Sequence, residues 1–322
     1  MMNIRWQRGR TYLVIGSLVF GMLFGAGNLV FPVHLGQLAG ANWGPAAAGF
    51  ISSGVLLPLL ALLALSVTRS RGLFDLARPV GDWFALVFLV MVHATIGPLC
   101  ATPRTAKGGF IGILGIGVLY LGLIYLGTTS RDQFSLATNG GTTLNQVAHY
   151  YLRAFGNALL LTLATVTCLT TAMGLVIAFS QDFHQRFPQI SYKTFLRLNC
   201  LLSFLIANLG LDQIVTWSTP VLMFLYPLAI VLICVALASP LFGRAPVVYR
   251  WALGLTIIPA FFALVANVPP ALQGWTVSRL LTGWAEQHLP LFATGFAWLP
   301  FALVGTAIGL AVRQYQRYNA GK

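Results

Sequence analysis

Apolar runs of about twenty residues recur along this chain of 322 residues, and they limit what it can fold into. An α-helix needs about 20 residues to cross roughly 30 Å of hydrocarbon. Hydrophobic residues make up 57% of the chain and charged residues 8%. Soluble proteins carry about 25% charged residues, so a soluble domain of this length could not keep its surface in water. The sequence therefore predicts an all-α fold, a polytopic bundle of transmembrane helices.

The apolar segments follow one another without a linker or low-complexity segment, so we expect residues 1–322 to form a single membrane domain. We place nine segments, at 11–35, 43–67, 82–101, 108–127, 157–179, 195–209, 215–238, 248–266 and 293–312. Residues 128–156 are too polar for lipid, and we expect a Gly140–Gly141 turn there, followed by a short amphipathic surface helix. Residues 267–290 are also polar and carry two tryptophans as interfacial anchors.

The net charge of +13 does not indicate a nucleic-acid partner, because the basic residues are scattered through short loops. In a membrane protein such residues orient the chain and contact lipid headgroups. The four cysteines lie inside or at the end of apolar runs, where they act as small hydrophobes. No nucleophile-and-base set, zinc-ligand spacing or phosphate loop is visible, so we expect neither an enzyme nor an organic cofactor.

The first apolar segment contains FGAGNLVFP, from Phe24 to Pro32, in which Gly25, Gly27, Asn28 and Pro32 crowd together at membrane depth. Glycine weakens a helix by up to about 1 kcal/mol and an interior proline by about 3 kcal/mol. Unwound backbone survives there only if protein covers it or it lines a wet cavity, as in the broken spans of many secondary transporters. Alternatively, the glycines only let a neighbouring helix approach closely. The added asparagine and proline favour the broken-span interpretation.

The segment 157–179 carries CLTTAMG, in which Thr170 and Thr171 offer adjacent hydroxyls in the middle of a span. Hydroxyl and carbonyl oxygens together suit a monovalent cation that must be released again. Threonine hydroxyls also commonly bond to their own helix and cost little in lipid. From this segment alone, the second interpretation is favoured.

Five motifs, FGAGNLVFP, GPLCATPRTA, CLTTAMGL, ANLGLDQIV and STPVLMFLYP, resemble the bacterial branched-chain amino acid carrier family in that order, across essentially the whole chain. The resemblance implies the broken-helix, inverted-repeat fold of amino acid–polyamine–cation transporters. It implies import of leucine, isoleucine and valine with sodium or protons through the cell membrane. The implied substrate-binding residues are Phe24, Gly25, Ala26, Gly27 and Asn28. The implied metal ligands, for sodium, are Gly25, Asn28, Thr170 and Thr171. We expect sodium because no carboxylate accompanies these residues in the sequence.

The chain departs from this family in its middle. Family members have twelve spans; residues 1–106 resemble spans one to three, and residues 107–322 resemble spans seven to twelve. The resemblance thus implies an internal deletion of the end of span three and of spans four to six. Span six is the inverted-repeat partner of span one and completes the substrate pocket. The alternative function is therefore a non-transporting remnant or an interaction subunit of such a carrier.

The basic residues predict that both termini are cytoplasmic and that the 128–156 and 267–290 loops are external. Of the nineteen basic residues, only Arg131, Arg153 and Arg279 then face outwards. This orientation needs an even number of crossings, so one of the nine apolar segments does not cross. Residues 82–106 are the best candidate for a re-entrant segment, because glycine and proline gather near its end. The alternative is that everything after the junction inserts upside down.

Overall fold

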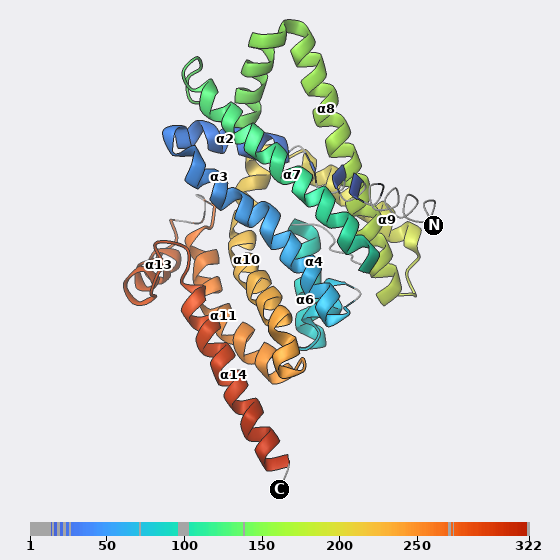
Figure 1. Cartoon of the computed structure of the whole chain (residues 1–322), viewed down its shortest axis with the longest axis vertical. Helices are drawn as coiled ribbons and strands as arrows, with labels where there is room; N and C mark the ends of the chain where they lie inside the picture. The colour runs from blue at the N-terminus through green and yellow to red at the C-terminus, as the bar shows by residue number, and fades with distance from the viewer. Residues whose placement is uncertain are drawn as a thin grey trace, which may run out of the picture. The chain divides into compact units, whose positions relative to one another are not determined.

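The computed structural model describes Val14 and residues 16–17, 20–21, 24–25, 27–70, 72–95, 103–137, 139–269, 272 and 274–320. These residues form helices joined by short turns (Figure 1), which confirms the all-α prediction. The chain divides into two compact units. Unit 1 comprises Met1–Leu62 with Ala101–Ile177, and unit 2 comprises Leu63–Cys100 with Ala178–Lys322.

Unit 1 is built around the contact of its N-terminal helices with one long helix. It contains α2 (Gly27–Ala39), the 3-10 turn η1 (Gly40–Asn42), α3 (Trp43–Ile51), the π-helix η2 (Ser52–Leu56), the start of α4 (Leu57–Thr68), α7 (Pro103–Ser130) and most of α8 (Gly140–Arg186). Elements α2, η1, α3 and η2 all pack against α7. Gly40 takes a φ of 51° in η1, a left-handed conformation that glycine adopts at no steric cost.

Helices α2 and α7 approach closely because small residues lie at their contact. A methyl group on Gly36 would collide with the carbonyl of Ile124, and one on Gly127 would collide with the carbonyl of Val33. The hydroxyl of Thr128 donates across the contact to the carbonyl of Gly36 at 3.1 Å. Small residues that bring backbones together are the usual means of packing helices in lipid, where no hydrophobic effect drives them together.

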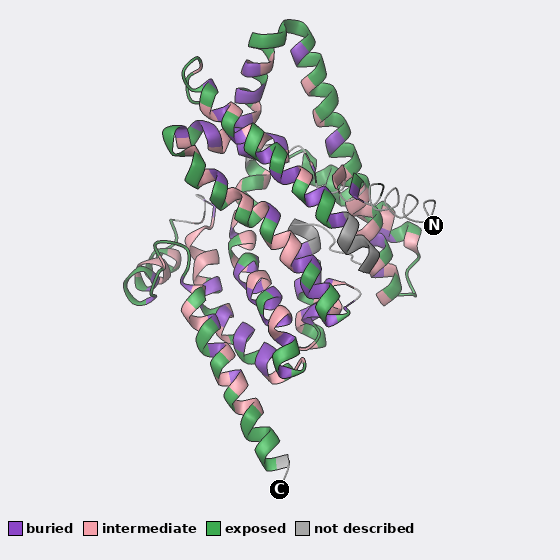
Figure 2. Ribbon diagram, in the orientation of Figure 1, coloured by how far each residue is buried: buried purple, intermediate pink, exposed green. Residues whose placement is uncertain are grey.

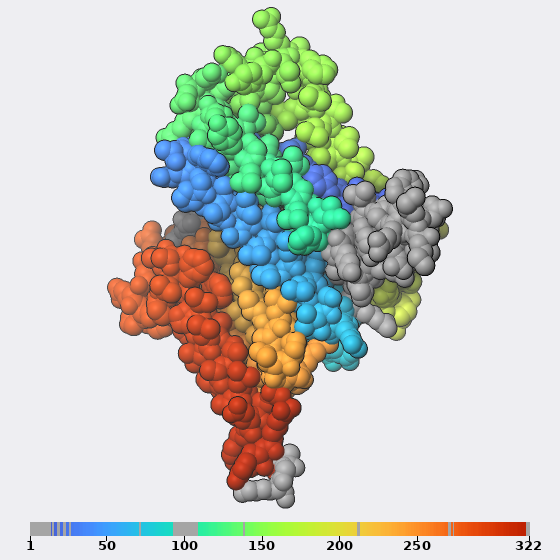
Figure 3. Space-filling view, viewed as in Figure 1, coloured from blue at the N-terminus to red at the C-terminus, as the bar shows by residue number. Residues whose placement is uncertain are grey.

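Unit 2 has α11 at its centre, packed against α10 on one side and α14 on the other. Its elements are the end of α4, α5 (Leu73–Ala77), α6 (Asp82–Thr95), the end of α8, α9 (Tyr192–Ala207), α10 (Leu211–Phe242), α11 (Pro246–Ala266), α13 (Thr276–His288) and α14 (Trp298–Ala320). Gly305 and Gly309 of α14 lie directly on the backbone of α11. The C-terminal turns of α14 stand clear of the other helices (Figure 3), and Tyr315 and Tyr318 are exposed there.

Five described helical stretches are long and apolar enough to cross a membrane. They are Gly27–Thr68, Gly109–Ser130, Gly140–Arg186, Gln213–Phe242 and Pro246–Ala266. Five of the nine predicted segments lie largely within these stretches. Segment 11–35 is described only in part, and the other three have no such stretch among the described residues. Helices α6 and α9 have only 14 and 16 residues, and the second half of α14 carries charged residues. Residues 96–102 lie outside the described residues, so the re-entrant path of 82–106 stays a prediction.

The start of α8 corrects the prediction of a Gly140–Gly141 turn. Both glycines are already helical, because Asn139 caps the helix: its Oδ1 accepts from the N–H of Thr142 at 3.0 Å. The helix is then interrupted at Arg153, which has a φ of 52° and a ψ of −135°. The predicted short helix therefore exists as the first part of α8, before the kink.

Beyond the kink, α8 is mostly exposed (Figure 2). Its large apolar side chains stand outwards, among them Leu161, Val166, Leu169 and Met173. An apolar face of this kind is stable in lipid, where the helix satisfies its own backbone hydrogen bonds.

Gly127→Ala should lower the midpoint of thermal unfolding of the purified protein. The added methyl group overpacks the α2–α7 contact, at a cost of about 1–3 kcal/mol. The methyl group would meet the backbone of Val33, which cannot move aside as a flexible side chain can, so we expect a cost in the upper part of this range. Such a cost exceeds the roughly 1 kcal/mol by which alanine favours a helix interior. Gly122→Ala is the matched control, because a methyl group on Gly122 of the same helix meets nothing within 4 Å. Equal midpoints for the two variants would show that this contact is not tight.

Candidate functional site

The first span is interrupted at Phe24 and Gly25. The N–H of Phe24 still donates to the carbonyl of Phe20 at 2.8 Å, but neither Phe24 nor Gly25 is helical. Helix α2 begins at Gly27, and the N–H of Asn28 donates back to the carbonyl of Gly25 at 3.0 Å. The predicted break is thus present, although it is shorter than the motif. Pro32 lies inside α2, and Ala26 lies outside the described residues.

One of the two predicted threonines reaches this break. The hydroxyl of Thr171 donates to the carbonyl of Gly21 at 3.4 Å. The same oxygen would lie 3.4 Å from a methyl group placed on Gly25. The half-buried side chain of Thr171 therefore packs directly against the non-helical backbone.

The other threonine does not reach the break, which corrects the expectation that both hydroxyls lie there. The hydroxyl of Thr170 donates within α8, to the carbonyls of Val166 at 3.0 Å and Thr167 at 3.1 Å. Its side chain is exposed. With 3.6 residues per turn, consecutive residues point about 100° apart, so a neighbouring pair cannot face the same partner.

A residue that the sequence analysis missed holds the side chain of Asn28. The hydroxyl of Tyr120 in α7 donates to Oδ1 of Asn28 at 2.8 Å. Tyr120 is 4% exposed, and its ring meets Phe50 of α3 edge-on at 4.9 Å between centroids. It also touches Gly54 of the π-helix. A tyrosine in the middle of an apolar, glycine-rich run was the available signal, because a buried hydroxyl needs a hydrogen-bond partner.

A second polar cluster, also missed, fixes the other end of α2. Gln37 is fully buried, and its Oε1 accepts from the hydroxyl of Thr143 at 2.8 Å and from the N–H of Ala137 at 3.2 Å. Its Nε2 donates to the carbonyl of Ser135 at 3.3 Å. Gln37 therefore anchors α2 to the loop before α8 and to the first turn of α8.

The break brings together neutral oxygens of the kind that hard cations prefer. They are the carbonyl of Gly21 and the hydroxyl of Thr171, which lie 3.4 Å apart. The carbonyl of Gly25 accepts from the N–H of Asn28, and the amide oxygen of Asn28 accepts from Tyr120. Among the described residues, no three His, Cys, Asp or Glu side chains lie close enough together to hold a metal ion. Phe24 is buried and stacks on Phe20 at 5.0 Å between ring centroids. Gly27 is half-buried, at the start of α2.

Tyr120→Phe keeps the ring packing and removes the hydrogen bond to Asn28, so it should destabilise the protein by about 1 kcal/mol. A double-mutant cycle with Asn28→Ala should give a coupling free energy of about 0.5–1.5 kcal/mol in thermal unfolding. Tyr125→Phe is the control on the same helix, because Tyr125 is 55% exposed and packs its ring on Trp43. Additive effects in the cycle would contradict the contact.

Comparison with known proteins identifies the relatives of this chain. The model of a family described as branched-chain amino acid transport protein matches residues 8–110 and 105–316. The branched-chain amino acid permease BrnQ of Lactobacillus delbrueckii subsp. lactis is 28% identical, over 89% of this chain and 93% of the relative. The permeases BrnQ and BraB of Bacillus subtilis are 28% and 26% identical, each over 92% of this chain and over 95% and 94% of their own lengths.

The chain is shorter than these relatives. The alignment with the Lactobacillus permease runs over 419 positions, more than the 322 residues present, so that relative contains a long stretch without a counterpart here. No solved structure matches the chain. The two family matches together cover nearly all of it and meet near the junction at Ala106 and Lys107. The chain is a multi-pass membrane protein and belongs to the branched-chain amino acid transport protein family.

Proposed function

We propose that this chain is a secondary active transporter that imports leucine, isoleucine and valine with a coupled cation. The observation that carries this proposal is the break at Phe24 and Gly25, found at the position of the FGAGNLVFP motif in a chain that belongs to this family. The relatives are named as branched-chain amino acid permeases. Because the function is transport, the chain is not an enzyme.

The substrate site in this proposal is the backbone from Phe24 to Asn28. An amino acid carries a carboxylate, and the N-terminal end of α2 offers it the positive end of a helix dipole. The aliphatic side chain of the substrate would lie against apolar walls nearby. Asn28 is fixed for this role by Tyr120, since the bond between them holds its side chain at the first turn of α2.

The coupling ion in this proposal is sodium, bound by Gly25, Asn28 and Thr171. Freed carbonyls and hydroxyls are the ligands that broken spans commonly present to sodium. Thr170 is left out of the set, because its hydroxyl donates to its own helix.

The second candidate is a non-transporting remnant or interaction subunit, and it is favoured by the stretch missing from this chain and by the exposed face of α8. We propose that the stretch missing from this chain is the end of span three and spans four to six, which include the partner of the first span. Helix α8 is also left with an exposed apolar face (Figure 2). The two candidates make opposite predictions for uptake.

Cells that lack their own branched-chain carriers and express this chain should take up labelled leucine faster than cells with an empty vector. The rate should rise with external sodium. The protein must be detected in the membrane fraction of both the wild type and each variant. With the protein present there, a rate equal to that of the empty vector would overturn transport and support the remnant.

The residue variants use the same assay. Thr171→Ala should raise the sodium concentration for half-maximal uptake about tenfold, which corresponds to roughly 1.4 kcal/mol of lost binding. Thr171→Ser keeps the hydroxyl and should stay near the wild type. Thr170→Ala is the matched control and should change sodium dependence little. Unchanged sodium dependence in Thr171→Ala would remove Thr171 from the site.

The orientation is also a proposal: both termini are cytoplasmic, and the 128–156 and 267–290 loops are external. The support is the distribution of basic residues, of which only three face outwards in this arrangement. Trp275, just before α13, and Trp284, within α13, are both exposed, as expected of anchors at a membrane surface.

Cysteine labelling from outside intact cells tests this orientation. Single cysteines replace Thr142, Ser191 or Ala320 in a chain whose native cysteines have been exchanged for serine. We expect labelling at position 142 alone. Labelling at positions 191 and 320 but not at 142 would instead show an inverted second half.

A further inference from the structure

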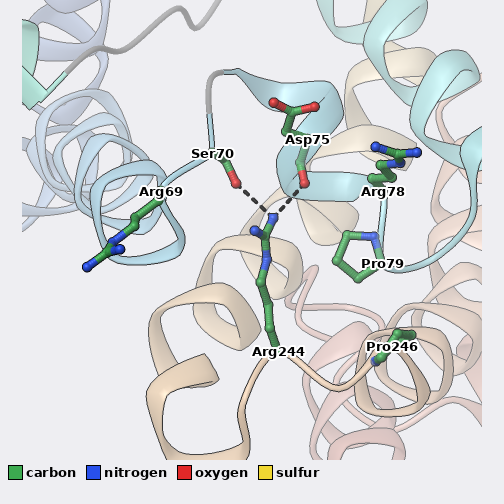
Figure 4. A pocket seen from close by; sticks show the side chains of 7 residues that line it. All are labelled: Arg69, Ser70, Asp75, Arg78, Pro79, Arg244 and Pro246. Atoms are coloured by element: carbon green, nitrogen blue, oxygen red, sulfur yellow. Dashed lines mark hydrogen bonds between the residues drawn. The ribbon is translucent and has the colours of Figure 1, made fainter.

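A basic cavity of about 420 Å³ lies in unit 2 where three helices begin or end (Figure 4). It is lined by Arg69, Ser70, Asp75, Arg78, Pro79, Arg244 and Pro246. Helix α4 ends at Thr68, one residue before the first lining residue, and α11 begins at Pro246. Helix α10 ends at Phe242, two residues before Arg244. The cavity therefore sits at one end of three apolar helices.

Arg244 connects the segments that line the cavity. Its Nη1 donates to the carbonyl of Thr68 at 3.0 Å, and its Nη2 donates to Oγ of Ser70 at 2.8 Å and to the carbonyl of Asp75 at 2.7 Å. Figure 4 shows this guanidinium between α5 and the end of α4. All three acceptors are neutral, so these bonds order the arginine without cancelling its charge. Its Nε is buried and has no partner among the described residues.

Two more arginines flank Arg244, one on each side (Figure 4). The side chain of Arg69 is exposed, and that of Arg78 forms an ion pair with Asp82 at 3.1 Å. Both members of that pair are mostly exposed, so the pair contributes little and leaves Arg78 available. The lining thus includes three arginines and one acidic residue, Asp75, and Figure 4 shows the guanidinium of Arg69 pointing away from that of Arg244.

The backbone positions of two arginines are unusual for this residue. Arg69 directly follows α4 and has a φ of 53°, and Arg244, the second residue after α10, has a φ of 56°. Glycine commonly fills such left-handed positions after a helix, and a residue with a Cβ is less stable there by about 1–2 kcal/mol. Strained backbone positions often occur at ligand sites, and both of these arginines belong to the lining of one cavity.

The ends of apolar spans lie at the depth of the lipid phosphates. Helices α10 and α11 are of spanning length and composition, and so is the helical run that ends with α4. Two other arginines contact residues next in sequence to the lining: Arg250 donates from Nε to the carbonyl of Val80, and the guanidinium of Arg186 lies 3.6 Å from the ring centroid of Phe74. We propose that this cavity binds the phosphate headgroup of an anionic phospholipid, with Arg69 and Arg78 as its ligands and Arg244 as the ordered base of the site.

The test measures lipid binding to the full chain purified in detergent. Phosphatidylglycerol is titrated against thermal unfolding, beside phosphatidylcholine with the same acyl chains and beside inorganic phosphate. Phosphatidylglycerol should raise the unfolding midpoint more than phosphatidylcholine does, because phosphatidylglycerol carries a net negative charge and phosphatidylcholine carries none. Equal effects of the two lipids would overturn the proposal. An equal effect of inorganic phosphate would overturn the lipid assignment.

Arg69→Gln/Arg78→Gln should weaken the apparent affinity for phosphatidylglycerol about tenfold. Arg244 is kept, because it holds α5 to the end of α4. The matched control is Arg197→Gln/Arg279→Gln, which removes two exposed charges elsewhere and should leave the affinity unchanged. Arg69→Lys/Arg78→Lys keeps the charge and should retain most of the binding, even if the glutamine variant folds poorly. Equal losses in the glutamine variant and the control, or no loss in either, would contradict the site.

Discussion

Backbone polar groups that leave a helix inside a membrane must find partners within the protein, and the site in unit 1 depends on this requirement. The interruption at Phe24 and Gly25 is covered by Thr171 from α8, while Tyr120 from α7 holds the first turn of α2. The second of these contacts needs α7 close to α2. That approach exists because Gly36 and Gly127 lack side chains where the two backbones meet. A packing feature with no chemistry of its own thus positions the residues that carry the proposed function.

Unit 2 meets the same requirement at its helix ends with a cationic side chain. The carbonyl of Thr68, in the last residue of α4, accepts from Arg244, which follows α10 in the chain. A guanidinium can satisfy several carbonyls at once because its donors form a rigid planar fork. It also brings a permanent positive charge, which a hydroxyl or amide would not. The corner at Arg244 therefore combines a structural bond with an electrostatic attraction for lipid phosphate, and the two roles share one side chain.

Helix α8 keeps a large exposed apolar face. Beyond Arg153, Thr167 and Thr171 of this helix are at least half-buried, while Leu161, Leu169 and Met173 are exposed. Lipid can solvate those apolar side chains. It cannot supply the hydrogen bonds that the opposite wall of a substrate pocket would provide.

Local composition and spacing were enough to establish the membrane class, most spans and the break in the first one, because these follow from residues close together in the chain. The residues that contact the break could not be predicted from local sequence. Asn28 and Tyr120 are 92 positions apart, and Gln37 and Thr143 are 106 apart, so only folding brings each pair together. The two threonines show the limit most clearly. Their sequence neighbourhood is the same, but the rotation of α8 turns Thr171 towards Gly25 and Thr170 away from it. Helix rotation is decided by packing against neighbours, and no pattern within one helix specifies which face those neighbours will cover.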